Sequence, residues 1–282
     1  MKDFNERVAA ITGAASGIGR ALAVRLAEDG CDLALSDVDE AGLEETVALC
    51  AEHPVKVTQT RVDVADRAAV HAWADEVVAA HGKVDLVINN AGVALAYTVE
   101  SMSYEDFEWL MGINFWGVVY GTKAFLPHLK ANGEGHIVNV SSVFGLVGVP
   151  TQSAYNAAKF AVRGFTDALR LELETEGSPV SCTTVHPGGV KTNIARSARL
   201  DPGAAQAIPG DDPAAAFNLI ARTTPERAAA TILDAVKHDR RRVVVGLDGM
   251  LFDLISRLPA VTYHGPVTLA ARLQRELSKL FG

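Results

Sequence analysis

Short apolar runs, rich in valine and isoleucine, alternate along this chain with longer segments of helical periodicity. Such runs are typical of strands buried on both faces, and the segments between them are long enough for helices that connect parallel strands. The expected strands span residues 8–12, 32–36, 55–61, 86–89, 136–140, 180–185 and 242–245. This alternation predicts an α/β fold with a doubly wound, seven-stranded parallel sheet and helices on both faces.

One helical segment has recognisable ends. Asp66 stands where it can cap a helix over residues 67–80, and Gly82 can close that helix in the left-handed conformation. No Pro/Gly/Ser-rich linker divides the 282 residues, so residues 1–246 are expected to form one domain, followed by an extension over residues 247–282.

Charge and apolar content exclude two classes of partner. The net charge is −8 and no basic run occurs, so no nucleic-acid partner is expected. No run of 18 apolar residues occurs, so no stable membrane insertion is expected. Cys31, Cys50 and Cys182 lie in separate apolar stretches, which favours a reducing compartment. Because the first residues lack an apolar signal core, a cytoplasmic location is expected.

A glycine-rich segment directly follows the first expected strand. Residues 12–19 read Thr-Gly-Ala-Ala-Ser-Gly-Ile-Gly and open a helix that runs through Ala27 to a break at Gly30. Glycines there let the backbone approach a pyrophosphate, which the amides at a helix start stabilise. An ordinary strand-to-helix loop is the alternative. The context favours a dinucleotide site and a Rossmann-type sheet, with Gly13, Ser16, Gly17, Ile18 and Gly19 at the cofactor.

Asp37 ends the second expected strand, 18 residues after Gly19. A carboxylate at this place can accept hydrogen bonds from the ribose hydroxyls of a dinucleotide, and it would repel a 2′-phosphate. Neither Ser16 nor Val38 is basic, so the chain lacks a cation where NADP is usually held. We therefore expect NAD as the cofactor, with NADP less favoured. The alternative is that Asp37 caps the next helix.

Tyr155 and Lys159 are four residues apart in a helical segment over residues 153–174. This spacing places them on one face, about 6 Å apart at their Cβ atoms. An ammonium beside a phenol favours the phenolate, so the pair suits proton transfer. Taken alone, the same spacing is also common between two surface residues.

Together these motifs resemble the short-chain dehydrogenase/reductase family. The resemblance covers residues 7–245 and consists of the glycine-rich segment, an acidic residue after the second strand, Asn-Asn-Ala-Gly at 89–92, a serine at a strand end, Tyr155-x-x-x-Lys159 and Pro187-Gly188. It implies an NAD-dependent oxidoreductase that interconverts an alcohol and a ketone. It also suggests a homodimer or homotetramer.

The resemblance also assigns roles to individual residues. The catalytic serine of the family lies thirteen residues before the tyrosine, which selects Ser142 over Ser141, and the opposite directions of successive strand side chains allow only one to face the substrate. With Ser142, Tyr155 and Lys159, Asn114 completes the catalytic set by keeping a water chain to the lysine. Its alternative role is capping or kinking a helix. The cofactor residues implied are Asp63, Val64, Asn90, Gly92, Tyr155, Lys159, Pro187, Gly188, Val190 and Thr192.

The histidines show no metal-ligand spacing, so no metal is expected, and His186 is interpreted as a packing residue. Residues 193–224 are expected to form a lid over the substrate. Their apolar residues Ile194, Leu200, Ile208, Phe217, Leu219 and Ile220, with Val143, Phe144, Leu146 and Val149 near Ser142, favour a lipophilic substrate.

Two other functions remain open. A 3-oxoacyl-thioester reductase would need cations near the pocket, for which Lys191, Arg196 and Arg199 are candidates. A non-catalytic NAD-binding protein is the second, because a fold alone does not determine function.

The extension carries Met250, Leu251, Leu254, Ile255 and Leu258 at helical spacing. This stripe is expected to pack on the core or on a second subunit, and a pocket cover or an interfacial membrane contact are the alternatives.

Overall fold

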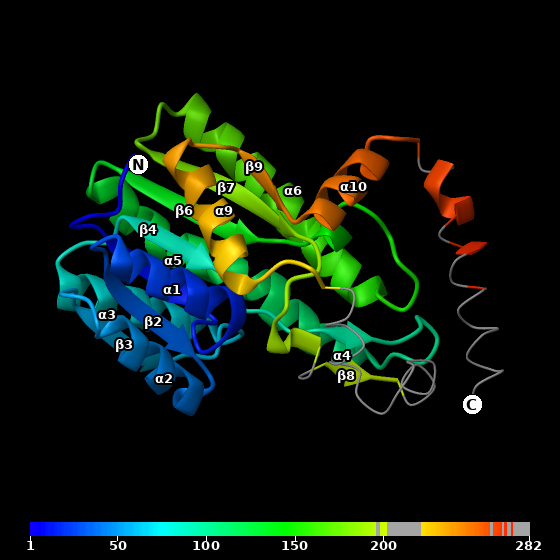
Figure 1. Ribbon diagram of the computed structural model, residues 1–282, viewed down its shortest axis with the longest axis horizontal. Coiled ribbons are helices and arrows are strands. Elements are labelled where there is room, and N and C mark those ends of the chain that lie inside the picture. The colour runs from blue at the N-terminus through cyan, green and yellow to red at the C-terminus, as the bar shows by residue number, and fades with distance from the viewer. Residues whose placement is uncertain (196–197, 202–220, 260–261, 267, 270–271, 273–282) are drawn as a thin grey trace.

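A computed structural model describes residues 1–195, 198–201, 221–259, 262–266, 268–269 and 272. Its centre is a sheet of seven parallel strands in the order β3-β2-β1-β4-β6-β7-β9 (Figure 1). The strands are β1 Val8–Thr12, β2 Asp32–Asp37, β3 Val57–Arg61, β4 Leu86–Asn89, β6 Gly135–Val140, β7 Val180–Pro187 and β9 Arg242–Val245. The predicted fold class is confirmed, and so are the seven strands in their parallel arrangement.

Helices cover both faces of this sheet, as predicted. One face carries α1 Gly17–Glu28, α2 Glu40–Cys50 and α9 Pro225–Lys237, and the other carries α3 Arg67–His81, α5 Gly117–Ala131 and α6 Ser153–Thr175. Alternate strand residues feed the two cores: Ala9 and Ile11 of β1 pack on the first face, and Val8 and Ala10 on the second. The strand order reverses between β1 and β4, where a doubly wound sheet opens a crevice for ligands.

The ends of the elements follow local hydrogen bonding. Strand β3 begins at Val57, two residues after the predicted start, because the amide of Val55 closes a turn onto the carbonyl of His53. Strand β7 continues two residues further than predicted, to Pro187, because it pairs with β9 to its end. Helix α3 has the predicted cap, since Asp66 accepts from the amides of Ala68 and Ala69, and Gly82 is left-handed at φ 78°.

A second sheet was not predicted. Strands β5 Leu95–Ala96 and β8 Arg199–Leu200 pair in parallel beside α4 Tyr104–Met111. The Arg199 guanidinium lies 3.7 Å from the centre of the Trp109 ring and 2.7 Å from an Asp106 carboxylate oxygen. These contacts attach part of the predicted lid to the α4 region. Ile208, Phe217, Leu219 and Ile220, also assigned to the lid, lie outside the described residues, as does Arg196.

The extension begins with helix α10 Leu247–Ser256, which lies beyond the end of the sheet at which β7 stops (Figure 1). Its apolar stripe was expected to pack on the core or on a second subunit, and most of the stripe is exposed in the single chain. Met250, Leu251 and Leu254 are 58–61% exposed, and Leu258 is 46% exposed. The face that packs on the domain instead carries Asp248, Gly249 and Phe252. Within the described ranges, no helix combines the length and apolarity needed to cross a bilayer.

Candidate active site

The glycine-rich loop packs so closely on the rest of the protein that larger residues would not fit there. Gly13 and Gly17 have φ values of 68° and 55°, in the region that favours glycine. A Cβ atom on Gly13 would lie 2.8 Å from Cα of Ala91, and one on Gly19 would meet the carbonyl oxygen of Gly13. Ser16 precedes α1 without a capping hydrogen bond from its side chain, and Ile18 packs partly against the core. The amides at the start of α1 therefore face the loop opening, where an anion would be stabilised.

Two residues brace this loop from the neighbouring strand. The side-chain amide of Asn90 donates to the carbonyls of Thr12 and Gly13 at 3.0 and 3.1 Å. The Thr12 hydroxyl in turn accepts from the amides of Asn90 and Ala91 at 3.0 and 3.1 Å. Asn90, predicted as a cofactor residue, thus shapes the loop itself. The role of Thr12 was missed, because a threonine ending a strand carries no separate sequence signal.

Asp37 joins the loop to the end of β2. Its carboxylate accepts from the amides of Ala15, Val38 and Asp39 at 2.9, 2.7 and 3.1 Å. The alternative role as cap of α2 does not apply, because that cap is Asp39, which accepts from the amide of Gly42. Asp37 therefore places a fixed negative charge beside the glycine-rich loop.

Two arginines near Asp37 were missed. Arg20 binds the carbonyls of Ala15 and Gly42 and the carboxylate of Glu45, so its charge is already engaged. Arg61 stands opposite Asp37 in the β2–β3 register and is exposed. Of the two, Arg61 is therefore the better candidate for a cation that could attract a 2′-phosphate.

Asp63 and Val64, both expected at the cofactor, lie just after β3. Asp63 accepts from the amide of Ala65 at 2.9 Å and closes a turn. Val64 is buried against α5, where a Cβ atom on Gly117 would lie 2.8 Å from the Val64 side chain. Both positions belong to the loop beside Asp37, although Val64 serves mainly in packing.

The two serines that follow β6 point in different directions. The Ser141 hydroxyl is buried and donates to the carbonyl of Lys159 at 2.8 Å, which attaches the strand to α6. The Ser142 hydroxyl accepts from the amide of Phe144 at 3.1 Å and lies close enough to the Tyr155 hydroxyl to lower the pKa of that phenol. Ser142 is thus the serine that meets the tyrosine.

Lys159 lies beneath Tyr155 on the same face of α6. The Lys159 ammonium is 5.6 Å from the centre of the Tyr155 ring and donates to the carbonyl of Val140 at 3.0 Å. Burial raises the pKa of Tyr155 to about 12, against a smaller lowering by the Ser142 hydrogen bond. Burial lowers the pKa of Lys159 to about 8. Desolvation of Tyr155 therefore opposes the phenolate, the form that a neighbouring ammonium was expected to favour.

Asn114 lies in a five-residue π-helix, Gly112–Trp116, between α4 and α5. Its side chain is fully buried and forms two 2.8 Å hydrogen bonds with the backbone of Val93, one to the amide and one to the carbonyl. A Cβ atom on Gly92 would lie 3.3 Å from the Asn114 oxygen and 3.6 Å from the Lys159 ammonium. Asn114, Gly92 and Lys159 therefore meet, and the π-helix places Asn114 at an irregular point between two α-helices.

Asn156, next to the tyrosine, was missed by sequence reasoning. It is buried and accepts from the amide of Val149 at 3.0 Å, while its side-chain amide donates to the carbonyls of Phe144 and Val147 at 2.6 and 2.8 Å. These bonds hold the loop after Ser142 against α6. This loop contains the apolar residues expected at the substrate mouth.

His186 has the packing role that was expected, with one specific contact. It is fully buried, and its Nδ1 lies 2.9 Å from the carbonyl oxygen of Ser142. Burial lowers the pKa of His186 to about 4, so the ring is neutral and Nδ1–H donates to that carbonyl. Among the described residues, no three His, Cys, Asp or Glu side chains gather as a metal site would require.

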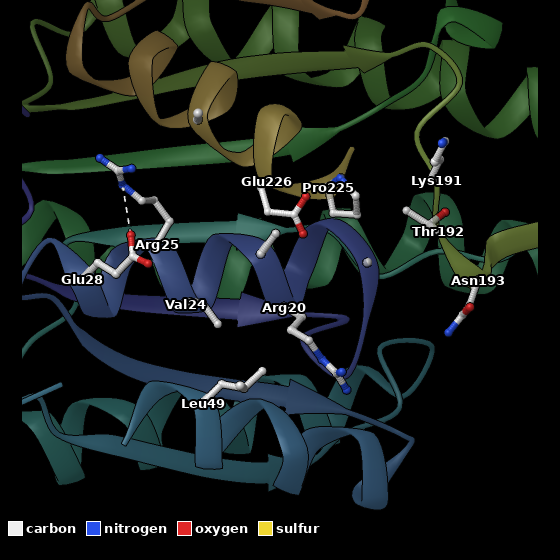
Figure 2. A pocket seen from close by; sticks show the side chains of 13 residues that line it. Arg20, Val24, Arg25, Glu28, Leu49, Lys191, Thr192, Asn193, Pro225 and Glu226 are labelled. Carbon is white, nitrogen blue, oxygen red and sulfur yellow. Dashed lines mark ion pairs between the residues drawn. The ribbon is translucent and has the colours of Figure 1, made fainter. Parts of the chain in front are cut away.

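The segment after β7 crosses back to the glycine-rich loop. Gly188 donates its amide to the carbonyl of Val245, and Val190 is buried. Thr192 then reaches α1, where a Cβ atom on Gly17 would lie 2.9 Å from the Thr192 methyl group. A groove of about 790 Å³ opens on the outer side of this contact, between α1 and the start of α9 (Figure 2). Its lining includes Lys191, Thr192 and Glu226 but neither Ser142 nor Tyr155, so the groove borders the cofactor loop rather than the reacting groups.

The residues present fit a dinucleotide. The glycines let the loop pack closely against Ala91 and Thr192, α1 begins at the loop with its free amides, and Asp37 and Thr192 stand on two sides of the loop. The candidate reacting groups Ser142, Tyr155 and Lys159 lie at the ends and flanks of β6, where ligands bind in sheets of this kind.

Comparison with known proteins agrees with this geometry. Residues 7–203 match the family model described as short chain dehydrogenase. A protein of Mycobacterium tuberculosis named as oxidoreductase SadH is 51% identical over 266 residues, covering 94% of this chain and 95% of the relative.

Two solved structures are also similar. A short chain dehydrogenase/reductase from Burkholderia phymatum in complex with NAD has a TM-score of 0.78 at 35% identity, covering 86% of this chain and 90% of that one. Levodione reductase has a TM-score of 0.78 at 31% identity, covering 88% and 98%. The family match over most of the chain confirms the resemblance read from the motifs: this protein belongs to the short-chain dehydrogenase/reductase family of oxidoreductases.

Proposed function

We propose that this protein is an NAD-dependent oxidoreductase that interconverts a secondary alcohol and its ketone. The observation that carries the proposal is the joined arrangement of the Ser142 and Tyr155 hydroxyls above the buried Lys159. Such an arrangement can hold a substrate oxygen between two hydroxyls and move a proton at that oxygen.

The roles follow from the environment of each group. When bound, NAD would supply the acceptor for the hydride that leaves the substrate carbon. Ser142 would donate a hydrogen bond to the substrate oxygen, and Tyr155 would exchange the proton with it. Because the pKa of Tyr155 is raised to about 12, the phenol holds its proton at neutral pH and is ready to act as the acid in ketone reduction. Alcohol oxidation needs the phenolate and should therefore be favoured by higher pH.

Asp37 supports NAD over NADP in this proposal. Its carboxylate is fixed by three backbone amides beside the loop that would hold the cofactor. A 2′-phosphate placed there would meet a like charge, while the adjacent Arg20 is already neutralised by Glu45. The exposed Arg61 is the feature that would favour the opposite choice.

A lipophilic substrate is proposed from the walls near Tyr155. The Phe144 ring lies edge-on to the Tyr155 ring at 6.2 Å, and Val143 and Leu146 are buried in the same loop. The acyl-thioester alternative is less well supported, because the Arg199 cation is engaged by Asp106 and Trp109. Lys191 lines the groove outside the cofactor loop.

Assembly and location remain proposals of the same kind. Trp116, Phe160 and Leu171 are exposed apolar side chains on the π-helix and α6, and a homodimer or homotetramer would cover such residues. A cytoplasmic location stays a prediction from the sequence.

The test is the absorbance of the reduced nicotinamide with a panel of secondary alcohols of graded bulk, with NAD and NADP supplied separately. We expect the band to grow with NAD and most strongly with bulky apolar alcohols. Replacing Tyr155 by phenylalanine should lower turnover by at least about a hundredfold and leave NAD binding nearly unchanged, because only the hydroxyl is lost.

Turnover with NADP alone would contradict the argument from Asp37. Normal turnover by the Tyr155→Phe variant would contradict the role of the tyrosine. A wild-type protein that binds NAD and oxidises none of the alcohols would favour the acyl-thioester or the non-catalytic function.

A further inference from the structure

Helix α10 touches the turn that follows β7. Asp248, in the first turn of α10, accepts a hydrogen bond from the backbone amide of Gly189 at 2.6 Å through Oδ2. The carboxylate also fills the space beside the preceding residue, since a Cβ atom on Gly188 would lie 2.5 Å from the same oxygen. A residue of the C-terminal extension is therefore in direct contact with the Pro187-Gly188-Gly189 turn.

The rest of this turn is held by backbone hydrogen bonds. The amide of Gly188 donates to the carbonyl of Val245, and the carbonyl of Gly189 accepts from the amide of Thr223. The amide of Lys191 then donates to the carbonyl of Thr223. Asp248 adds a side-chain acceptor to these backbone hydrogen bonds. It binds the amide of Gly189, which lies between the Gly188 amide and the Gly189 carbonyl, the two groups with backbone partners. Because a charged acceptor makes a stronger hydrogen bond than a neutral one, Asp248 should restrict the turn more than a neutral acceptor would.

A second contact places α10 at the same site. Phe252, one turn after Asp248, lies edge-on to Phe144 at 6.2 Å, and Phe144 lies edge-on to Tyr155 at the same distance. Gly249, next to Asp248 in the helix, permits close packing, since a Cβ atom there would lie 2.9 Å from the Val244 side chain. The inner face of α10 thus runs from the turn after β7 to the aromatic wall beside the tyrosine.

We propose that Asp248 is a positioning residue for the cofactor: it fixes the Pro187–Gly189 turn so that Val190 and Thr192 stand correctly toward the cofactor. This inference rests on the proposed function, with Val190 and Thr192 among the cofactor residues that the family resemblance implies. It assigns the extension a part in building the site, in addition to any contact made by its exposed leucines. Loss of the carboxylate should weaken cofactor binding without removing any group that touches the cofactor.

The chain offers a matched control on the same helix. Asp253 pairs with Arg242 and Arg257, and it makes no hydrogen bond to the turn in the described structure. Asp253→Asn therefore removes the same charge from α10 and loosens its attachment to β9, but it leaves the Asp248–Gly189 hydrogen bond in place. Comparing the two sites separates a specific role of Asp248 from general docking of the helix.

The experiment compares the full-length wild type with Asp248→Ala, Asp248→Asn and Asp253→Asn by two measurements. Hydrogen–deuterium exchange, followed by mass spectrometry on peptides that contain residues 187–192, reports on the turn in the ligand-free protein. Titration with NADH, followed by its fluorescence, reports on cofactor affinity. We expect Asp248→Ala to speed exchange at the turn and to weaken NADH binding about tenfold.

The conservative variant provides the rescue. Asp248→Asn keeps a carbonyl oxygen that can accept from Gly189, so its NADH affinity should fall by no more than about threefold. Asp253→Asn should change neither the exchange at the turn nor the NADH affinity.

Each contrary result has a distinct meaning. Unchanged exchange in Asp248→Ala would overturn the anchoring contact, whatever happens to the cofactor. Faster exchange with unchanged NADH affinity would overturn the positioning role, as would an equal loss of affinity in Asp253→Asn. A wild-type protein that binds neither NADH nor NADPH would overturn the proposed function and the positioning role together, while the exchange measurement would still decide whether Asp248 holds the turn.

Discussion

Two buried histidines should make this protein lose stability as the pH falls from 7 to 5. His136 and His186 are each at most 1% exposed, and burial lowers the pKa of each to about 4 from an ordinary value of 6.5. The charge of Asp239 raises the pKa of His136, whereas those of the N-terminus and Arg170 lower it further; Asp253 raises the pKa of His186, whereas Arg242 and Arg163 lower it further. The two carboxylates do not overcome the cost of burying a charged ring, so both rings are neutral in the folded protein.

The sign follows from proton binding. Below pH 6.5 the unfolded chain protonates both rings, whereas the folded protein leaves them neutral until the pH approaches about 4. Their contribution to stability is therefore fully present above pH 6.5 and is lost as the pH falls toward 4. Between pH 7 and pH 5, the free energy of unfolding should therefore fall by about 2 kcal/mol for each ring, or by about 4 kcal/mol for the two.

Matched substitutions separate this effect from the titration of carboxylates. The Nδ1 of His186 bonds the Ser142 carbonyl, so asparagine can replace that donor without titrating. The Nε2 of His136 is hydrogen-bonded to the Thr183 hydroxyl, and the side-chain amide of glutamine can form the same bond without titrating. Urea unfolding at pH 7 and pH 5, followed by circular dichroism, should show the wild type losing about 4 kcal/mol more than the His136→Gln/His186→Asn double variant. Equal losses in the two proteins would refute the reasoning.

Two further predictions concern the cofactor and the substrate loop. Asp37→Ser should lower the ratio of kcat/KM for NAD over NADP by at least about tenfold, because the charge that opposes a 2′-phosphate is lost, and an unchanged ratio would contradict that role. Asn156→Ala should lower the unfolding free energy by about 2 kcal/mol and raise the KM for the alcohol more than that for NAD, because three hydrogen bonds to the loop after Ser142 disappear. Steady-state kinetics and urea unfolding test this, and an equal rise in both KM values would count against it.

Strands β1, β4, β6 and β7 were the most readily predictable because they are buried on both faces. A parallel strand with helices on either side reads as an unbroken apolar run, and such runs stand out from the amphipathic segments between them. Strands β5 and β8, two residues each, have no such signal. They exist because the Arg199 region docks on α4 through Asp106 and Trp109, contacts between segments almost a hundred residues apart.

The chemical groups were predictable where a short spacing defines them. Tyr155 and Lys159 share one face of a helix, so their proximity follows from the helix alone. The ionisation of the pair was not predictable, because it depends on burial by neighbouring elements, and that burial moves the two pKa values in opposite directions. The bracing roles of Thr12 and Asn156 were also hidden, since hydrogen bonds to backbone atoms of distant loops leave no pattern in the sequence.

Helix α10 shows why periodicity identifies a helix more reliably than it identifies the buried face. Its leucines and methionine define an apolar stripe, yet they are the exposed side. The opposite side meets the end of a parallel sheet, where backbone amides such as that of Gly189 need hydrogen-bond acceptors. The helix must also come close to the backbone of the turn there. A carboxylate, a glycine and one aromatic ring satisfy those needs better than a row of leucines. The exposed stripe is then free for a second subunit, so the face that a simple hydrophobic argument assigns to the core is the face most available to another molecule.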